Sequence, residues 1–179
     1  MTERNGPARR GGSGRGSRRG SSRPDDRTRR PKRPADPASV PVRDEARVAA
    51  RDVLRAVRER DAYANLVLPA LLRERKITGR DGALATELAY GACRSLGLLD
   101  AVIADCAGRP IAEIDGPLLD ALRLGVYQLL RTRIGAHAAV ATTVDLVRAE
   151  SGSPESSSGK AGFVNAVLRR ASERSVDEW

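Results

Sequence analysis

The sequence predicts an all-α fold: a compact bundle of about seven helices preceded by a disordered basic tail. From Arg43 onward, apolar residues recur at intervals of three and four, and no segment alternates apolar and polar residues as a strand would. Aromatic residues make up only 3% of the chain against 40% hydrophobic residues, which indicates an aliphatic core suited to closely packed helices. A length of 179 residues is sufficient for one such domain with a tail.

The predicted tail, residues 1–41, is rich in Arg, Gly, Ser and Pro and lacks apolar periodicity. Residues 1–34 contain twelve Lys and Arg against three Asp and Glu, whereas the rest of the chain contains twenty of each. The whole net charge of +9 therefore lies in this segment, which cannot bury enough apolar surface to fold. Such a tail favours contact with nucleic-acid phosphates, and a merely solubilising tail is the alternative.

Four helices are expected before the centre of the chain. Their ranges are Arg43–Arg60, Asn65–Lys76, Thr78–Leu96 and Leu98–Ala107. Thr78 is a suitable N-cap for the third helix, and Gly97 is expected to separate the third from the fourth.

A central helix beginning near Leu118 is expected to be the buried hub, because apolar residues occupy most of its circumference. Asp115 could cap it, with Pro117 in its first turn. Gly125 stands in its middle, where glycine costs about 1 kcal/mol relative to alanine. Close approach of a neighbouring helix is the expected compensation.

Two further helices are expected, His137–Glu150 and Gly162–Arg174, joined by a flexible serine-rich loop at Ser151–Gly159. The folded domain is thus expected to span residues 42–174. Residues 175–179 resemble the start of a linker to a further domain that is missing from this chain.

The first expected helix contains a row of arginines at spacings of 4, 4, 4 and 3, which predicts one exposed arc of guanidiniums. The row consists of Arg43, Arg47, Arg51, Arg55 and Arg58. Asp52 and Glu59 should project away from it, so pairing with carboxylates should be incomplete. A phosphate-binding surface and a simply solvated face are both compatible with the row.

No catalytic residue or metal site is expected. Cys93 and Cys106 lie in helical patterns without metal-ligand spacing, which favours a reduced, cytoplasmic protein. His137 is the single histidine and is expected to cap or pack at a helix corner. No apolar run is long enough to span a bilayer, and no membrane partner is expected.

Four strings resemble the NusB family of all-helical RNA-binding domains, over about residues 43–170. They are Glu87–Gly91 (ELAYG), Gly125–Leu130 (GVYQLL), His137–Ala139 (HAA) and Phe163–Leu168 (FVNAVL). Three others resemble the NusB-like N-terminal domain of bacterial ribosomal RNA cytosine-5 methyltransferases of the RsmB (Sun/Fmu) type. These are Thr132–Ile134 (TRI), Ala107–Pro110 (AGRP) and Leu168–Arg170 (LRR).

The resemblance implies that RNA is bound by the first helix and by the region before the last helix. Carried onto this chain, that role falls on Arg43, Arg47, Arg51, Arg55 and Lys160. Arg58, Arg169 and Arg170 would extend the basic surface. Gly162 departs from the pattern, because NusB itself often has a basic residue there.

The resemblance also implies that S-adenosylmethionine would be the cofactor of a following catalytic domain, if one exists. This chain contains neither the glycine-rich cofactor turn nor the Pro-Cys motif of those enzymes. The favoured function is RNA binding, as the substrate-docking part of a 16S ribosomal RNA (cytosine-C5) methyltransferase. A stand-alone antitermination factor that binds RNA with a ribosomal protein is one alternative, and a helical protein-interaction module is another.

Overall fold

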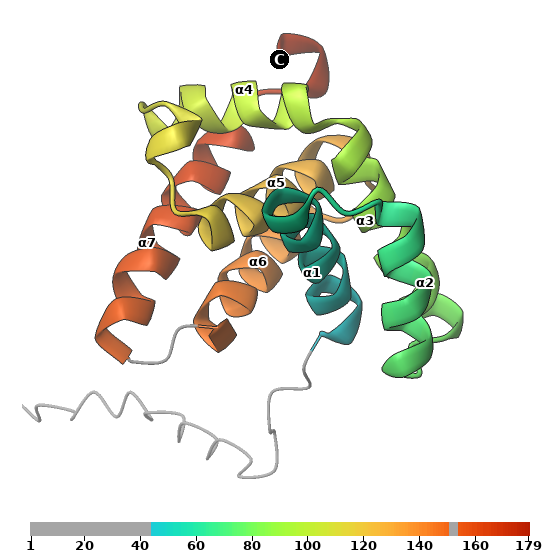
Figure 1. The fold of residues 1–179 in the computed structure, drawn as a ribbon. Coiled ribbons are helices and arrows are strands. Elements are labelled where there is room, and N and C mark those ends of the chain that lie inside the picture. The colour runs from blue at the N-terminus through green and yellow to red at the C-terminus, as the bar shows by residue number, and fades with distance from the viewer. Residues whose placement is uncertain (1–43, 151–153) are drawn as a thin grey trace, which may run out of the picture. The chain divides into compact units, whose positions relative to one another are not determined.

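The computed structural model describes residues 44–150 and 154–179, so Arg43 and the predicted tail lie outside the described residues. The described chain forms the helices α1 (Glu45–Arg60), α2 (Ala64–Glu74), α3 (Gly79–Arg94), α4 (Leu96–Ala107), α5 (Gly116–Arg131), α6 (Ala136–Glu150) and α7 (Pro154–Ala171). Two short 3-10 helices, η1 (Ile111–Glu113) and η2 (Val176–Glu178), complete it (Figure 1). The residues described contain no β-strand, and the all-α prediction is confirmed.

Helix α5 is the centre of the bundle, as its apolar circumference predicted. It contacts α1, α3, α4, α6 and α7, and it passes through the middle of the ribbon in Figure 1. Leu122, Leu124 and Val126 on it are completely buried. Asp115 is the N-cap residue and Pro117 lies in the first turn, although the Asp115 side chain makes no capping hydrogen bond.

Two glycines allow the neighbouring elements to approach closely. A Cβ atom added to Gly125 would lie 2.8 Å from both Cδ atoms of Leu168 and 3.1 Å from Cγ2 of Thr143, so α6 and α7 close over α5 at this point. A Cβ atom on Gly91 would overlap the ring of Tyr127. That tyrosine is buried in the core, and its hydroxyl donates to Oε1 of Glu87 at 2.6 Å. The compensation expected for a mid-helix glycine is therefore confirmed at Gly125.

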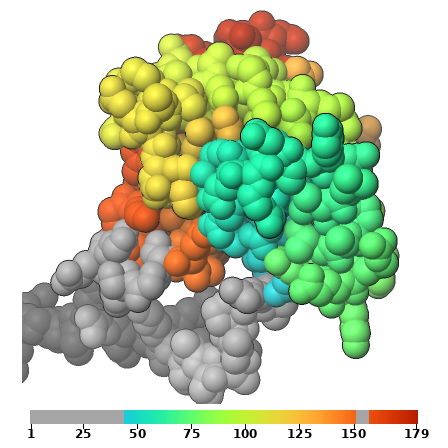
Figure 2. Space-filling view, in the orientation of Figure 1, coloured from blue at the N-terminus to red at the C-terminus, as the bar shows by residue number. Residues whose placement is uncertain are grey.

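Helix α1 is nearly surrounded by other helices. It packs against α2, α3 and α5, and its alanines Ala49 and Ala50 are fully buried. On the face drawn in Figure 2, the cyan to teal surface of α1 lies between the green atoms of α2 and the orange atoms of α6. A helix in this position has little circumference left for a solvated row of side chains.

The model corrects two boundaries predicted from the sequence. Gly97 does not separate two helices: α3 ends at Arg94, the chain turns at Ser95, and Gly97 is the second residue of α4. Helix α7 begins at Pro154, inside the segment expected to be a loop. Proline suits a first helical position because no N–H is needed there. The helix is then held to the core by Val164 and Leu168, which outweighs the weak helix propensity of the serines.

The last residues fold back onto the domain. Ser175 and Glu178 form a capping box around η2, and the indole Nε1 of Trp179 donates to the carbonyl of Ala171 at 3.2 Å. The guanidinium of Arg174 lies 4.6 Å from the centre of the Trp179 ring. Residues 175–179, predicted to begin a linker, thus contact the end of α7.

Candidate nucleic-acid interface

The arginines of α1 do not form the exposed arc that their spacing predicted. Arg47 and Arg51 are each only 8% exposed, and all four arginines of the row within the described residues pair with carboxylates. The expectation of incomplete pairing is therefore wrong. It failed because the face of α1 that bears the row turns toward α5 and the end of α6, where acidic side chains meet it.

At the start of the row, Arg47 is bound to the interior of the bundle. Asp44, the N-cap of α1, accepts from the backbone N–H of Arg47 at 3.1 Å and also pairs with its guanidinium. The Nε of Arg47 donates to Oε1 of Gln128 at 2.8 Å. Gln128 is completely buried on α5 and donates in turn to the carbonyl of Leu124. The buried side-chain amide of Gln128 thus fixes the position of the Arg47 guanidinium.

At the end of the row, Arg58 makes a two-point contact with a buried carboxylate. Its Nε and Nη2 donate to Oδ2 of Asp120 at 3.0 and 2.9 Å, and the Asp120 side chain is 0% exposed. Burial raises the pKa of Asp120, although hydrogen bonding to Arg58 and the charges of Arg58 and Arg123 oppose that rise. The hydrogen bond from Arg58 to Asp120 is in turn the main reason that the pKa of Arg58 is raised. We call Arg47 and Arg58 the core pair.

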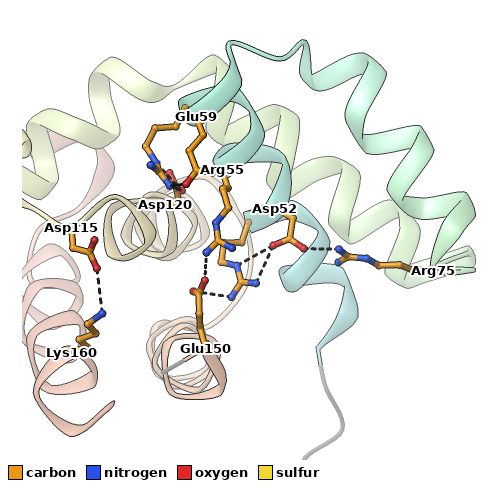
Figure 3. Close-up of polar contacts among 10 residues, drawn as sticks. Asp52, Arg55, Glu59, Arg75, Asp115, Asp120, Glu150 and Lys160 are labelled. Atoms are coloured by element: carbon orange, nitrogen blue, oxygen red, sulfur yellow. Dashed lines mark hydrogen bonds and ion pairs between the residues drawn. The ribbon is translucent and has the colours of Figure 1, made fainter. Parts of the chain in front are cut away.

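In the middle of the row, Arg51 and Arg55 share one carboxylate at the end of α6. Oε2 of Glu150 accepts from Nη1 of Arg51 at 3.1 Å, and Oε1 pairs with Nη2 of Arg55 (Figure 3). Arg51 also donates to Oδ1 of Asp52, whose other oxygen accepts from Arg75, the C-cap residue of α2, at 2.6 Å. The Glu150 side chain is 29% exposed, whereas Gln128 and Asp120, the partners of the core pair on α5, are completely buried. We call Arg51 and Arg55 the Glu150 pair.

The predicted site residues of α7 fall into two groups. Lys160 is partly exposed, and its Nζ lies 3.3 Å from Oδ2 of Asp115 (Figure 3). Arg169 and Arg170 are exposed near the other end of the helix, and Arg170 donates to the carbonyl of Cys106 on α4 at 2.9 Å. Ten residues of helix separate Lys160 from Arg170, which is about 15 Å along the axis. The eight predicted residues therefore do not form one compact cluster.

A shallow groove runs between α6 and α7, with an apolar floor that includes Val140 and Val144. His137, Asn165 and Arg169 line it. His137 is exposed, so its expected packing role is wrong: Ala139, two residues on, is the side chain that turns inward at this corner.

The two thiols are poorly suited to nucleophilic chemistry. Burial is the main cause that raises the pKa of Cys93 and of Cys106, so the protonated form is favoured at both. No helix in the described part of the chain is long and apolar enough to cross a membrane.

A family model described as "NusB family" matches residues 44–173, which include all seven helices. The chain belongs to the NusB family. The match extends from the N-cap of α1 to just beyond the end of α7.

Among relatives of this NusB-family chain, a Mycobacterium tuberculosis (strain H37Rv) protein named as a candidate methyltransferase is 57% identical over 154 residues. That match covers 86% of this chain and 31% of the relative. A Pseudomonas putida protein named ribosomal RNA small subunit methyltransferase B is 38% identical over 125 residues, covering 70% of this chain and 27% of the relative. The chain thus spans about a third of the length of these curated relatives.

Solved structures support the same assignment. The chain resembles one in a crystal structure of the antitermination factors NusB and NusE with double-stranded RNA, at 25% identity and a TM-score of 0.63. The match covers 73% of this chain and 96% of that one. A Thermotoga maritima NusB shares the fold, with a TM-score of 0.65 and 19% identity over 74% of this chain and 92% of that one.

The strings that marked the NusB resemblance are packing elements in this structure. Gly91 accommodates the ring of Tyr127, and Gly125 accommodates Leu168. The residues that sequence reasoning missed are instead the acceptors Asp120, Gln128 and Glu150. Only Glu150 carried a sequence signal: it is an acidic residue at the last position of a helix, where the helix dipole disfavours negative charge.

Proposed function

We propose that this chain is an RNA-binding domain that docks ribosomal RNA for a cytosine-5 methyltransferase. The NusB fold supports it, together with relatives named ribosomal RNA small subunit methyltransferase B that match this region and a structural neighbour that contains RNA. Within the domain, the observation that carries the proposal is the Glu150 pair: two guanidiniums four residues apart on α1 that meet a partly exposed carboxylate.

RNA would be held through its phosphates. Arg51 and Arg55 would contact the backbone, with Lys160 on α7 and Arg169 farther along that helix. The +9 charge of residues 1–34 would raise the rate of encounter with a polyanion. The core pair would take no part, because buried groups hold its guanidiniums.

The chemistry of methyl transfer is not assigned to these residues. S-adenosylmethionine is the cofactor that the methyltransferase relatives imply, and the resemblance places it in a following catalytic domain with a glycine-rich cofactor turn. The residues described form only helices and do not fit a site of that kind. The role proposed for this chain is therefore to bind and orient RNA.

A stand-alone antitermination factor is the second candidate, since the solved neighbours include NusB bound to NusE and RNA. Relatives named as methyltransferases match at 57% and 38% identity, against 25% for that neighbour, which favours the methyltransferase role. Both candidates require RNA binding by the same face.

The test is a salt titration of RNA affinity. Fluorescence anisotropy of a labelled, loop-containing ribosomal RNA fragment should show binding by the full chain that weakens steeply as salt rises. Replacing the Glu150 pair, Arg51→Gln with Arg55→Gln, removes the contact of these two guanidiniums with the RNA backbone. The slope of log K against log salt should then become shallower by about 0.7 for each single-stranded phosphate contact that is lost. Absence of binding at low salt would refute the proposal.

A further inference from the structure

The carboxylate of Glu150 lies between two guanidiniums, at the position where an anionic ligand of these arginines would bind. Each of its two oxygens meets a different guanidinium, Oε2 that of Arg51 and Oε1 that of Arg55 (Figure 3). Carboxylates and phosphates bind arginine in the same way, because two of their oxygens accept hydrogen bonds from guanidinium N–H groups. The position that Glu150 occupies is therefore also suited to the non-bridging oxygens of a phosphate.

Glu150 has fewer restraints than the acceptors that hold the core pair from the interior or from the N-cap. Asp120 is 0% exposed, and Asp44 is also fixed by its capping hydrogen bond to the backbone of Arg47. Glu150 is 29% exposed and pairs only with the two arginines among the described residues. It is also the last residue of α6, at the negative end of the helix dipole. Glu150 is therefore a carboxylate that a stronger anion can displace, and it is the one that two arginines share.

The arginines themselves are not fully satisfied by Glu150. The Nε of Arg55 is buried and has no hydrogen-bond partner among the described residues. A backbone phosphodiester has two non-bridging oxygens, as a carboxylate has two, and each can accept from more than one donor. Because they are set at tetrahedral angles and are not fixed to the end of α6, they could reach this remaining donor as well as the two guanidiniums.

We propose that Arg51 and Arg55 form a site for one RNA backbone phosphate, and that Glu150 occupies it until RNA displaces the carboxylate. The proposal rests on the proposed function, and adds that RNA binds by exchange of anions at a defined position. Arg51 is 8% exposed in the present arrangement, in which its guanidinium pairs with Glu150, and departure of the carboxylate would free that side of the guanidinium. Glu150 would then set the affinity of the domain for RNA by competing with it.

The chain offers a matched control on the same helix. Asp145 on α6 is also acidic, but within the described part of the chain it pairs only with Arg148, at 3.4 Å, and both side chains are largely exposed. Asp145→Asn therefore changes the net charge by the same amount as Glu150→Gln, without touching the Glu150 pair. General electrostatic attraction of RNA would affect both variants equally.

The experiment measures the affinity of the full chain for a fluorescein-labelled, mixed-sequence RNA oligonucleotide by anisotropy at fixed salt. Glu150→Gln should bind about three- to tenfold more tightly than the unmodified chain, and Asp145→Asn less than about twofold more tightly. In the Arg51→Gln/Arg55→Gln background, Glu150→Gln should bring no gain beyond that of Asp145→Asn. Circular dichroism of each variant confirms that it is folded.

Two results would overturn the exchange model while leaving the proposed function intact. Equal effects of Glu150→Gln and Asp145→Asn would show that only net charge matters. Weaker binding by Glu150→Gln, with RNA still bound through Arg51 and Arg55, would show that Glu150 orients the arginines instead of competing with RNA. No RNA binding by any variant, Glu150→Gln included, would overturn both proposals.

Discussion

The core pair and the Glu150 pair belong to one regularly spaced row on α1 but have different surroundings. The side chains of Arg55 and Arg58 are 32% and 26% exposed and lie three residues apart. Their acceptors differ far more, since Glu150 is 29% exposed and Asp120 is 0% exposed. These two neighbouring arginines therefore differ mainly in whether their partner on another helix is buried, and little in their own exposure.

The largest expected effect is on folding at the core pair. Arg58→Ala leaves the Asp120 carboxylate buried without its main partner, which should lower the free energy of unfolding by about 3–5 kcal/mol. Urea denaturation followed by circular dichroism measures it. The double variant Arg58→Ala/Asp120→Ala should recover part of the loss, because the uncompensated charge is gone. A loss below about 1 kcal/mol in the single variant would show that Arg58 contributes as little to stability as an exposed ion pair does, and would remove it from the core pair.

A smaller loss is expected from the other member of the core pair. Gln128→Ala removes the buried acceptor of Arg47 and should cost about 1–3 kcal/mol of unfolding free energy. Asp44 still pairs with this guanidinium, which limits the effect. RNA affinity at a temperature where the variant is folded should not change. If the variant lost RNA affinity as well as stability, Arg47 would also contribute to RNA binding, and the core pair would no longer differ in role from the Glu150 pair.

The pH dependence of stability sharpens the contrast further. Burial raises the folded-state pKa of Asp120, so the folded protein holds this proton more tightly than the unfolded chain does. The stability that protonation contributes is fully present below the ordinary aspartate pKa of about 3.9, and is lost as pH rises through the folded-state pKa. The unfolding free energy of the unmodified chain, minus that of Asp120→Asn, should therefore fall as pH rises above about 4. A difference that rises instead would mean that Arg58 dominates over burial.

Much of this fold could be predicted from periodicity alone, including the buried hub helix and the close approach at Gly125. The start of α7 could not, because buried contacts at Val164 and Leu168 hold a helix that the serines do not favour. Only one half of the candidate site, the row of arginines, could be predicted from the sequence. The spacing of the arginines predicts that they share one side of a helix, but their acceptors on α5 and α6 lie 62 to 99 residues away along the chain. Only tertiary packing decides which guanidinium meets which carboxylate.

The smallest expected effect concerns Lys160. It is partly exposed, and its partner Asp115 is about half exposed, so the pair contributes little to stability. Lys160→Gln should weaken RNA binding by about two- to threefold and leave the unfolding free energy within about 0.5 kcal/mol. Anisotropy and urea denaturation check the two values. A tenfold loss of RNA affinity would show that the RNA interface is centred on α7 and not on α1.

The most direct test compares Arg55→Gln with Arg58→Gln, measuring RNA affinity and unfolding free energy for each. The account predicts a crossed result: Arg55→Gln loses about tenfold or more in affinity with little change in stability, whereas Arg58→Gln loses stability and, while folded, keeps its affinity. Equal losses of affinity in the two variants, or a loss of stability without any loss of affinity in Arg55→Gln, would contradict it.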